Sequence, residues 1–430
     1  MENSLYRPRV CDNLLQSKLR TNGAVLITGP KWCGKTWTAL NAAKSVLYMQ
    51  DPDKRSSYLK LAQTQPSYLL KGEKPRLIDE WQMAPVLWDA VRFEVDKTSA
   101  KGEFILTGSV AVPDNETLNI EDRRYHSGTG RIARMKMRPM SLYESGESTG
   151  QISLSELFDG QSDINSFGEL SIEDYAFSIC RGGWPESIEI ENRSDALSIA
   201  RDYIESVCEF EIEELTETRK DPERMRNILI SLSRNISTLT TDKTIMDDVK
   251  ANDVSLTNKT LENYLKVLRD LFIIEDIKAW QPSLRSKTGI RTSDKRQFVD
   301  PSIAAGLFRL TPASLMEDFN FYGFLFESLC ARDLRIYSEP LGGVIKHYHD
   351  NSGLETDLII YLPDGRWAPV EVKLGSKEIE KGAENLKKLV SKIDTQKCKL
   401  PSFMMIITGG ELAYKREDGI YIIPLSCLKN

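Results

Sequence analysis

Residues 24–37 read A-V-L-I-T-G-P-K-W-C-G-K-T-W, an apolar strand followed directly by the pattern G-x-x-x-x-G-K-T. A strand before this pattern and a helix after it are the setting that a phosphate-binding loop requires. The alternative is a chance glycine-rich turn, and both the preceding strand and a second motif further along the chain argue against it. The stretch therefore predicts a P-loop fold with a site for a nucleoside triphosphate.

Each residue type in this loop has a physical role. Gly29 and Gly34 allow a tight turn in which backbone N–H groups point inward at the phosphates. The helix that begins near Lys35 adds the positive end of its dipole. We expect Lys35 to reach the β and γ phosphates and the Thr36 hydroxyl to hold Mg²⁺. The predicted nucleotide-binding residues are Gly29, Pro30, Lys31, Trp32, Cys33, Gly34, Lys35, Thr36 and Trp37.

A second apolar strand, residues 76–79, ends in the acidic pair Asp79 and Glu80. We expect Asp79 to orient Mg²⁺ and its waters beside Thr36. Glu80, one residue past the strand, is expected to take a proton from the attacking water. The alternative is a strand edge with two solvated acids, and it stays open for Glu80 more than for Asp79.

Two further residues are candidates for the same chemistry. A third strand, residues 103–107, ends in Thr107, whose hydroxyl is expected near the γ phosphate. Arg131 follows a glycine-containing loop and is expected to stabilise the charge that develops in phosphoryl transfer, in cis or across a subunit boundary. A solvated arginine at the start of a strand is an equally good interpretation of Arg131.

The composition is that of an ordinary globular protein. The chain has 430 residues, 40% of them hydrophobic and 28% charged, and its length suggests two to four domains. A net charge of −6 argues against a surface coated with nucleic acid. Seven dispersed cysteines favour reduced thiols over disulfides or a zinc site. With no secretory signal and no apolar run of membrane length, we expect a cytoplasmic protein without a membrane partner.

Cys33 is distinct because it lies inside the loop, where amide dipoles and Lys35 favour a thiolate. One hypothesis is that oxidation or alkylation of this thiol blocks nucleotide binding. The alternative, which we favour, is that a small residue fills a tight turn.

Strand and helix signals alternate over the first 145 residues, which predicts an α/β fold with a mostly parallel sheet. Residues 144–166 are rich in Ser, Gly, Asp and Glu and are interpreted as a loop or boundary. The predicted divisions are an ATPase domain at 1–150, a helical linker at 166–235, a winged helix-turn-helix at 236–300 and a nuclease-like domain at 301–430.

The third division has the element order of a winged helix-turn-helix: a short helix, a longer helix at 258–272, and two strand-like arms around a polar loop. Residues 278–296 carry six bases against one acid, a local charge of +5. A polar helix beside a basic wing is suited to DNA backbone and groove contacts. Alternatively, the module only packs domains together. The predicted DNA-binding residues are Lys259, Asn263, Lys266, Lys287 and Arg291.

The C-terminal third holds a second candidate site. Asp357 opens one predicted strand, and Glu371 and Lys373 lie on one face of the next, after a helix that carries Glu327. Carboxylates on neighbouring strands can hold Mg²⁺, and a nearby lysine can orient water in phosphodiester cleavage. This D-(13 residues)-E-x-K order on an αβββαβ frame resembles the restriction-endonuclease-like nuclease core. The alternatives are a nuclease-type fold without cleavage, or a chance pair of acids.

The chain as a whole resembles a prokaryotic family of AAA-type P-loop ATPases with a C-terminal domain of unknown function. The motifs that carry the resemblance are Arg9, Gly29 to Thr36, Leu77–Glu80, Leu106–Ser109, Gly130-Arg131, Pro139–Leu142, Gly182–Glu186, Phe298–Pro301 and Glu371–Leu374. The resemblance implies an ATPase core, a helical linker, a winged helix and a nuclease-like terminal domain, with ATP as the nucleotide. It gives Lys35, Thr36, Asp79 and Glu80 their usual roles. Trp32 and Cys33 depart from the small or aliphatic residues more common there.

Two functions from different classes are consistent with these features. The first is a Mg²⁺-dependent ATPase that couples its nucleotide state to DNA binding or processing. The second is an ATP-gated protein-interaction switch whose nuclease-like domain cleaves nothing. The sequence leaves the oligomeric state, the DNA sequence and any protein partner open.

Overall fold

The structure is a computed structural model that describes residues 6–109, 130–161, 164–211, 221–251, 253–282 and 293–430. The described residues form two compact units. The first contains residues up to 139 together with 270–272, and the second contains 140–269 and 273–430. Each unit has its own sheet and its own hydrophobic core.

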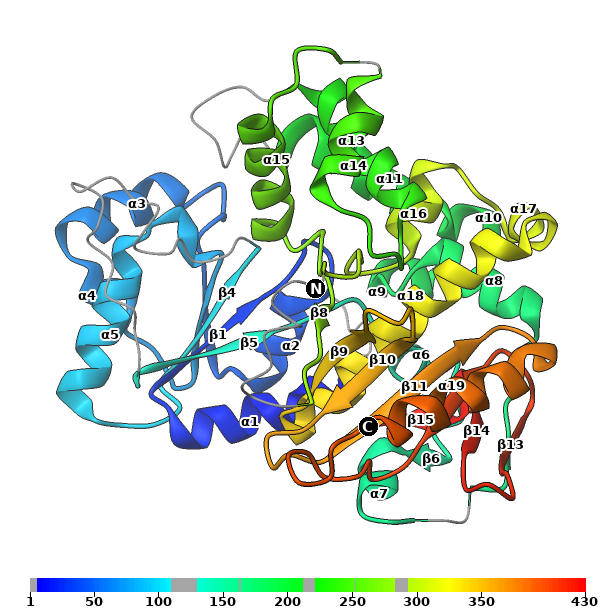
Figure 1. The fold of residues 1–430 in the computed structure, drawn as a ribbon. Coiled ribbons are helices and arrows are strands. Elements are labelled where there is room, and N and C mark those ends of the chain that lie inside the picture. The colour runs from blue at the N-terminus through cyan, green and yellow to red at the C-terminus, as the bar shows by residue number, and fades with distance from the viewer. Residues whose placement is uncertain (1–5, 110–129, 162–163, 212–220, 252, 283–292) are drawn as a thin grey trace. The chain divides into compact units, whose positions relative to one another are not determined.

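The first unit is built on a five-stranded parallel sheet with the strand order β2-β3-β4-β1-β5 (Figure 1). Its strands are β1 (Ala24–Thr28), β2 (Ser45–Tyr48), β3 (Arg76–Asp79), β4 (Phe104–Gly108) and β5 (Ile132–Lys136). Its helices are α1 (Cys11–Thr21), α2 (Lys35–Ala42), α3 (Arg55–Thr64), α4 (Pro66–Leu69), the 3₁₀ turn η1 (Trp81–Met83) and α5 (Val86–Thr98). This α/β arrangement confirms the fold class that the alternating pattern predicts.

Both faces of this sheet are covered, as the uninterrupted apolar run of β1 requires. Successive side chains of a strand point to opposite faces. Leu26 therefore packs with Trp88 of α5 in one core cluster, while Val25 and Ile27 pack with Leu15 of α1 in the other. Burial of both faces makes this sheet a rigid base for the residues at its edge.

One edge of the sheet collects the candidate residues. All five strands run in the same direction, so their carboxyl ends lie together. β1 ends at Thr28, directly before the phosphate loop, and β3 ends at Asp79. Thr107 lies one residue before the end of β4. Strand direction and register thus bring three separate segments of the chain to one edge.

The second unit contains an eight-stranded mixed sheet with the order β7-β13-β14-β12-β11-β10-β9-β8. Its larger strands are β9 (Val344–His349), β10 (Glu355–Tyr361), β11 (Trp367–Lys373), β12 (Met405–Thr408), β13 (Leu412–Lys415) and β14 (Tyr421–Pro424). Its two-residue strands are β7 (Ser166–Phe167) and β8 (Lys278–Ala279). A separate two-stranded sheet is formed by β6 (Ile152–Ser153) and β15 (Leu428–Lys429). The central strands β9, β10 and β11 pair antiparallel, whereas β11, β12 and β14 pair parallel.

Helices account for most of the rest of this unit. The N-terminal set is α6 (Leu142–Ser145), α7 (Leu154–Phe158), α8 (Ile172–Arg181), α9 (Pro185–Glu189), α10 (Arg193–Ala196), α11 (Ser198–Ser206) and the π-helical turn η2 (Val207–Glu211). The middle set is α13 (Pro222–Arg234), α14 (Asp242–Lys250) and α15 (Asn258–Asp270). The last set is α16 (Ser302–Leu307), α17 (Pro312–Glu317), α18 (Phe319–Ser338) and α19 (Ile379–Ser391), with the 3₁₀ turns η4 (Glu339–Leu341), η5 (Ser376–Glu378) and η6 (Leu425–Cys427).

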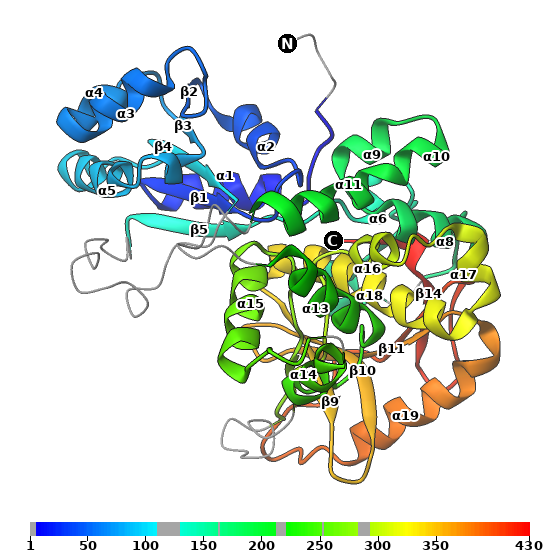
Figure 2. The same ribbon diagram turned by 90° about the horizontal axis from the view of Figure 1, so that it is seen from above.

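Strands β10 and β11 lie between α18 and α19 in the view from above (Figure 2). The element order α18–β9–β10–β11–α19–β12 is the order that the sequence predicts for this region. On the amphipathic α19, Ala383 and Leu386 pack against Ile406 of β12 and Ile422 of β14. The pairing of β12 with β14 extends the sheet beyond the predicted frame.

A buried ion-pair network fixes three segments of this unit around α18. The Arg332 guanidinium lies 2.9 Å from an Asp300 carboxylate oxygen and 2.8 Å from one of Asp333. Asp300 also accepts a hydrogen bond from the Gly183 backbone at 3.1 Å, and Asp333 accepts one from the Leu142 backbone at 3.0 Å. Removing one partner of such a buried pair costs about 3–5 kcal/mol. The network thereby joins motifs that stand far apart in the sequence.

Two regions differ from the sequence prediction. The polar stretch 144–166 is not only a loop: β6 pairs with β15 at the C-terminal end of the chain, and α7 follows it. Ile152, Leu154 and Leu157 are buried there. The prediction of a loop followed the polar composition of the whole stretch and so gave no weight to these three apolar residues. The arms predicted beyond α15 pair through the isolated bridges Ile274↔Phe298 and Ile277↔Lys295 instead of forming a regular hairpin.

None of the helices in the described ranges combines the length and the apolar character needed to cross a bilayer.

Candidate functional site

The phosphate loop has the backbone of a tight turn. Gly34 (φ 99°) and Trp32 (φ 64°) adopt left-handed conformations, which glycine tolerates and tryptophan seldom adopts. A Cβ atom on Gly29 would lie 2.2 Å from the carbonyl oxygen of Met137, so a side chain cannot fit there. Gly34 is also the N-cap of α2, where backbone N–H groups have no partner within the helix. The loop therefore presents a glycine cradle at a helix N-terminus, the arrangement that receives phosphate oxygens.

Lys35 and Thr36 lie at the mouth of this cradle. Lys35 is buried, and its Nζ donates to the carbonyl oxygens of Gly29 at 3.0 Å and Pro30 at 2.7 Å. Thr36 Oγ1 donates to Asp79 Oδ1 at 2.8 Å. The loop and the end of β3 are thus in direct contact, as the sequence predicts for a shared metal site.

Asp79 and Thr107 form a second link along the same edge. Thr107 Oγ1 donates to Asp79 Oδ1 at 2.6 Å and accepts from the Glu80 backbone N at 3.2 Å. Through these two hydrogen bonds, the buried Thr107 hydroxyl connects β4 to β3. Its expected proximity to a γ phosphate stays a prediction.

Glu80 has an unusual backbone and two side-chain partners. Its φ of 55° and ψ of 51° are left-handed, a strained conformation that clusters at functional sites. Its carboxylate accepts hydrogen bonds from Ser109 Oγ at 3.3 Å and from the Gln82 side chain. The carboxylate is therefore held in place beside Asp79 by neighbours on both sides.

Arg9 is a residue of this site to which sequence reasoning assigned no role. Its guanidinium is buried and donates to the carbonyl oxygen of Cys33 at 2.9 Å and to that of Arg138 at 2.8 Å. The Arg9 backbone N donates in turn to Asp12 Oδ2 at 2.9 Å. A lone arginine ahead of the first helix has no local pattern, so only the family resemblance pointed to it.

The remaining loop residues differ in exposure. Cys33 is fully buried, with its Sγ 3.9 Å from the carbonyl oxygen of Met137. This geometry favours the interpretation that Cys33 fills a tight turn. Trp32 and Trp37 are each 45% exposed, and Lys31 is half-buried. The two tryptophans are therefore accessible from solvent on either side of the buried cysteine.

Arg131 lies at the edge of the sheet opposite the phosphate loop. It directly precedes β5, and its carbonyl oxygen accepts from the backbone N of Ala24, the first residue of β1. The phosphate loop begins at the other end of β1, a full strand away. The Arg131 guanidinium instead pairs with Asp96 at 2.6 Å. This position does not favour a role for Arg131 on its own subunit's nucleotide, and its role in phosphoryl transfer, in cis or across a subunit boundary, stays a prediction.

The donors at this edge fit ATP and Mg²⁺. A hydroxyl and a carboxylate already in contact, Thr36 and Asp79, are hard oxygen ligands of the kind that Mg²⁺ takes beside substrate phosphates. The glycine cradle and the Lys35 ammonium supply hydrogen-bond donors for phosphate oxygens.

The second candidate site, in the C-terminal sheet, brings its predicted residues together. Lys373 Nζ lies 2.7 Å from Glu371 Oε2 and 3.3 Å from Asp357 Oδ2. Asp357 Oδ2 also accepts from the Val372 backbone N at 2.8 Å. Glu327 of α18 belongs to the same cluster, because Lys295 of the predicted wing pairs with both Glu327 and Asp357.

Lys295 is one of the six bases of residues 278–296. Its Nζ lies 2.8 Å from Glu327 Oε1, 3.2 Å from Glu355 Oε1 and 3.8 Å from Asp357 Oδ1. Sequence reasoning missed Glu355 as well, although strand alternation places it on the same face as Asp357. For Lys295 no local signal exists, because its partners lie 32 or more residues further along the chain.

Burial and mutual repulsion shift the protonation of this cluster. Burial raises the pKa of Glu327 to about 8, although Lys295 acts in the opposite direction. Burial and the nearby Asp357 charge raise the pKa of Glu371 to about 8. Burial acts on Asp357 too, but Lys295 and Lys373 outweigh it and hold the pKa of Asp357 below its usual value. Four carboxylates share two ammonium groups, so two of the buried acids favour their protonated form.

The described residues contain no group of three or more His, Cys, Asp or Glu side chains arranged to hold a metal ion. The metal-binding role predicted for Glu327, Asp357, Glu371 and Lys373 stays a prediction.

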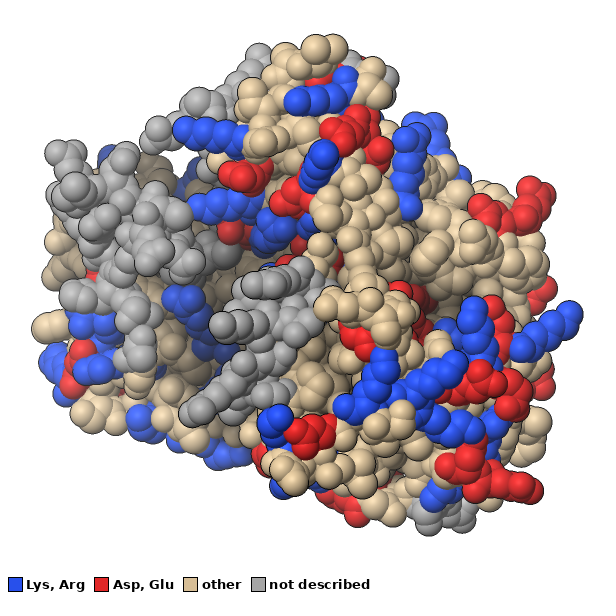
Figure 3. Space-filling view, viewed as in Figure 1, with Lys and Arg blue, Asp and Glu red and all other residues tan. Residues whose placement is uncertain are grey.

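Three of the five predicted DNA-binding residues can be located. Lys259, Asn263 and Lys266 are exposed on α15, whose opposite face is buried. Lys287 and Arg291 lie outside the described residues. Acidic and basic side chains alternate over the surface formed by α13, α14 and α15 (Figure 3). In that view the surface is mixed in charge.

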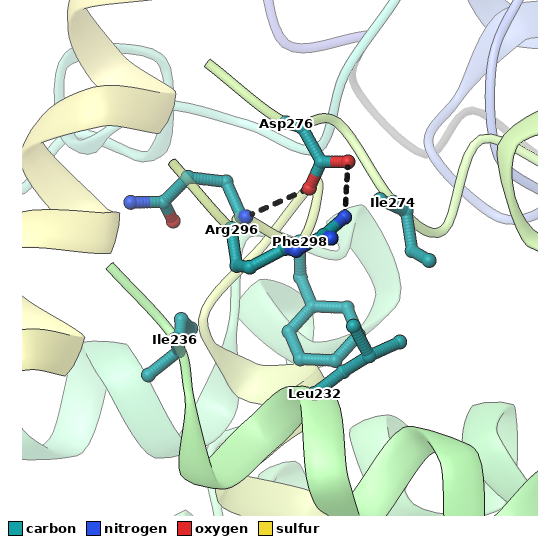
Figure 4. Close-up of a pocket in the computed structure, with 7 residues that line it drawn as sticks. Leu232, Ile236, Ile274, Asp276, Arg296 and Phe298 are labelled. Atoms are coloured by element: carbon teal, nitrogen blue, oxygen red, sulfur yellow. Dashed lines mark hydrogen bonds and ion pairs between the residues drawn. The ribbon is translucent and has the colours of Figure 1, made fainter. Parts of the chain in front are cut away.

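The predicted wing is less basic at its surface than its composition indicates. Lys295 is buried in the acidic cluster, and Arg296 is buried between Asp276, at 3.2 Å, and Asp242. Figure 4 shows the Arg296–Asp276 pair beside Phe298, in a crevice whose packing leaves no room for a water-sized molecule. Two of the six bases are therefore buried and paired with acids inside this unit, and they add no positive charge to its surface.

Three family models match separate parts of the chain. Residues 21–146 match an AAA domain, residues 172–314 match a domain of unknown function (DUF8612), and residues 322–428 match another (DUF4143). The first segment is accordingly a P-loop ATPase domain of the AAA type. No curated protein matches the chain. A solved structure, the Walker-type ATPase PABY2304 of Pyrococcus abyssi, is similar at 16% identity and a TM-score of 0.41, covering 70% of this chain and 94% of that one.

Proposed function

We propose that this chain binds ATP with Mg²⁺ at residues 29–37 and hydrolyses the bond between its β and γ phosphates. The observation that supports this most strongly is the 2.8 Å hydrogen bond from Thr36 to Asp79, which joins the loop to the end of β3 at one edge of the sheet. Bound Mg²⁺ neutralises phosphate charge and orients the phosphoryl group. Thr36 and Asp79 would hold it, directly or through water.

The chain's own residues supply the other steps. Lys35 exchanges its two loop carbonyls for phosphate oxygens, which are stronger partners because they are charged. Glu80 accepts a proton from the attacking water, and Ser109 and Gln82 hold its carboxylate for that task. Thr107 keeps the ends of β3 and β4 together through Asp79 and the Glu80 backbone.

We further propose that the nucleotide state is coupled to DNA binding through α15. The exposed face of this helix carries Lys259, Asn263 and Lys266, which are of the residue types that contact DNA phosphates and bases, while its apolar face is buried. The finer division into helical linker, winged helix and nuclease-like domain belongs to this proposal, as does assembly into an oligomer that would bring Arg131 to a neighbouring nucleotide.

A second candidate is an ATP-gated protein-interaction switch with a C-terminal domain that does not cleave nucleic acid. The mixed charge around α15 favours it, because acidic side chains among the basic ones repel DNA phosphates (Figure 3). The pairing of Lys295 and Lys373 with the acids of the C-terminal sheet favours it too.

The deciding experiment is the steady-state ATPase rate with and without duplex and single-stranded DNA, beside a Lys35→Ala control. Loss of the rate in the control supports the assigned nucleotide site, and full activity in the control would overturn that assignment. Stimulation by DNA supports the coupling through α15. A rate that is indifferent to DNA favours the protein-interaction switch.

A further inference from the structure

The acidic centre of the C-terminal sheet contains a cation supplied by the chain itself. Lys295 is 1% exposed, and its ammonium lies within 4 Å of carboxylate oxygens from Glu327, Glu355 and Asp357. These acids come from helix α18 and strand β10. A single ammonium group is therefore surrounded by three carboxyl groups, an arrangement otherwise made around a divalent metal ion.

The second lysine neutralises the rest of the centre. Lys373 lies between Glu371 and the other carboxylate oxygen of Asp357, at 2.7 and 3.3 Å. Both oxygens of Asp357 thus face ammonium groups, Lys295 on one side and Lys373 on the other. An incoming divalent cation would need Asp357 as a ligand and would meet both lysines at close range.

Lys295 is held in this position by its backbone. Its N–H donates to the carbonyl oxygen of Ile277 at 2.9 Å, and its carbonyl oxygen accepts from the Ile277 N–H at 2.8 Å. This antiparallel bridge fixes the segment from which the side chain enters the centre. Withdrawing the ammonium would leave buried carboxylates without a counter-charge, which strongly destabilises a folded chain.

We propose that Lys295 is the resident cation of this carboxylate centre, that it replaces a divalent metal ion, and that the native chain binds no metal there. The centre then acts as a structural joint, which ties the segment before Arg296 to α18 and β10. Metal-dependent phosphodiester cleavage has no metal site at these residues. The inference does not depend on ATP binding at the first unit.

The test is Mn²⁺ binding followed by electron paramagnetic resonance on the full chain without nucleotide. A Thr36→Ala background removes the metal ligand of the phosphate loop, so that any bound Mn²⁺ reports on other sites. We expect no bound Mn²⁺ that depends on Glu371 in this background. Bound Mn²⁺ that disappears on Glu371→Gln would overturn the proposal, because a metal site would then exist with Lys295 in place.

The matched arm replaces the ammonium by a neutral side chain of similar length. In Lys295→Met we expect a lower melting temperature and the appearance of bound Mn²⁺, which Glu371→Gln again removes. A melting temperature equal to that of the parent would overturn the proposal, since the acids would then need no resident cation. The double variant Lys295→Met/Glu327→Gln, with one buried acid fewer, is expected to regain part of the lost melting temperature. If Lys295→Met does not fold, the native arm and this double variant still decide the question.

Discussion

The Arg9 guanidinium donates to the carbonyl oxygen of Cys33 at 2.9 Å, inside the phosphate loop. Its other terminal nitrogen donates to the carbonyl oxygen of Arg138 at 2.8 Å, just past the end of β5. One buried side chain therefore joins the loop to the segment that leaves the sheet. Because both acceptors are backbone atoms, the contact positions the loop whatever the side chains of residues 33 and 138 are.

Arg9→Ala should weaken ATP binding about tenfold, since a hydrogen bond to a charged group is worth about 1.5–3 kcal/mol and the loop loses its support. Titration with a fluorescent ATP analogue measures the dissociation constant. Arg20→Ala is the control, because Arg20 is exposed on α1. Equal ATP affinities for the two variants would show that Arg9 does not support the phosphate loop.

Asp79→Asn should raise the Mg²⁺ concentration needed for half-maximal ATPase activity, because the carboxylate that accepts from Thr36 becomes an uncharged amide with one oxygen. Activity titrated against Mg²⁺ at fixed ATP gives the apparent metal affinity. Thr36→Ser keeps the hydroxyl and is expected to retain most of the activity, whereas Thr36→Ala is expected to lose it. A normal Mg²⁺ titration in Asp79→Asn would contradict the assigned metal site.

Glu80→Gln should leave ATP binding unchanged and lower the turnover number about a hundredfold to ten-thousandfold, the usual contribution of a general base. The amide keeps the size of the carboxylate and one of its two acceptor oxygens but cannot accept the proton. Equilibrium binding and single-turnover hydrolysis, measured on the same preparation, separate the two effects. An unchanged turnover number would mean that Glu80 is only a solvated acid at the strand edge.

A combined Lys259→Glu/Lys266→Glu variant should weaken duplex DNA binding if α15 touches phosphates. Each phosphate that the protein neutralises adds about 0.9 to the steepness with which log K falls against log salt concentration. Binding measured at several salt concentrations should therefore give a shallower slope for this variant than for the native chain. Charge reversal at exposed Lys381 and Lys388 on α19 is the matched control. DNA affinity that responds equally to both pairs would point to non-specific attraction.

His347 should make the protein less stable in acid. Burial, together with the charge of Lys295, lowers the pKa of His347 from its ordinary 6.5 to about 4. A histidine with a depressed pKa in the folded state stabilises the protein above pH 6.5, and this contribution is lost as the pH falls toward 4. The contribution is about 3 kcal/mol, at about 1.4 kcal/mol for each unit of pKa.

Urea unfolding of the native chain and of His347→Gln between pH 7 and pH 4 measures this effect. The unfolding free energy of His347→Gln should fall less steeply over that interval. His349→Gln, two residues further along β9 and partly exposed, should behave like the native chain. Parallel curves for the native chain and His347→Gln would show that the buried ring is not the acid-sensitive group.

Local sequence predicted the secondary structure of both sites well. Alternation and helical spacing predict strands at 344–349 and 367–373 and a helix at 378–393, because both patterns depend on neighbours in the chain. The strands β9 and β11 have these bounds, and α19 differs from the predicted helix by one residue at its start and two at its end. The sequence prediction lacks β6, because its two residues are held by pairing with β15 at the other end of the chain. A two-residue strand has no periodicity of its own.

The sequence by itself determined the phosphate loop and its adjacent helix, because Gly29 to Thr36 are consecutive residues whose conformation depends on short-range geometry. Only the tertiary structure decided the places of Arg131 and Lys295. Parallel strand register puts Arg131 at the edge opposite the loop, and packing draws Lys295 from a predicted basic surface into a buried acidic centre. Both outcomes depend on contacts between segments far apart in the chain, which residue type and local spacing do not encode.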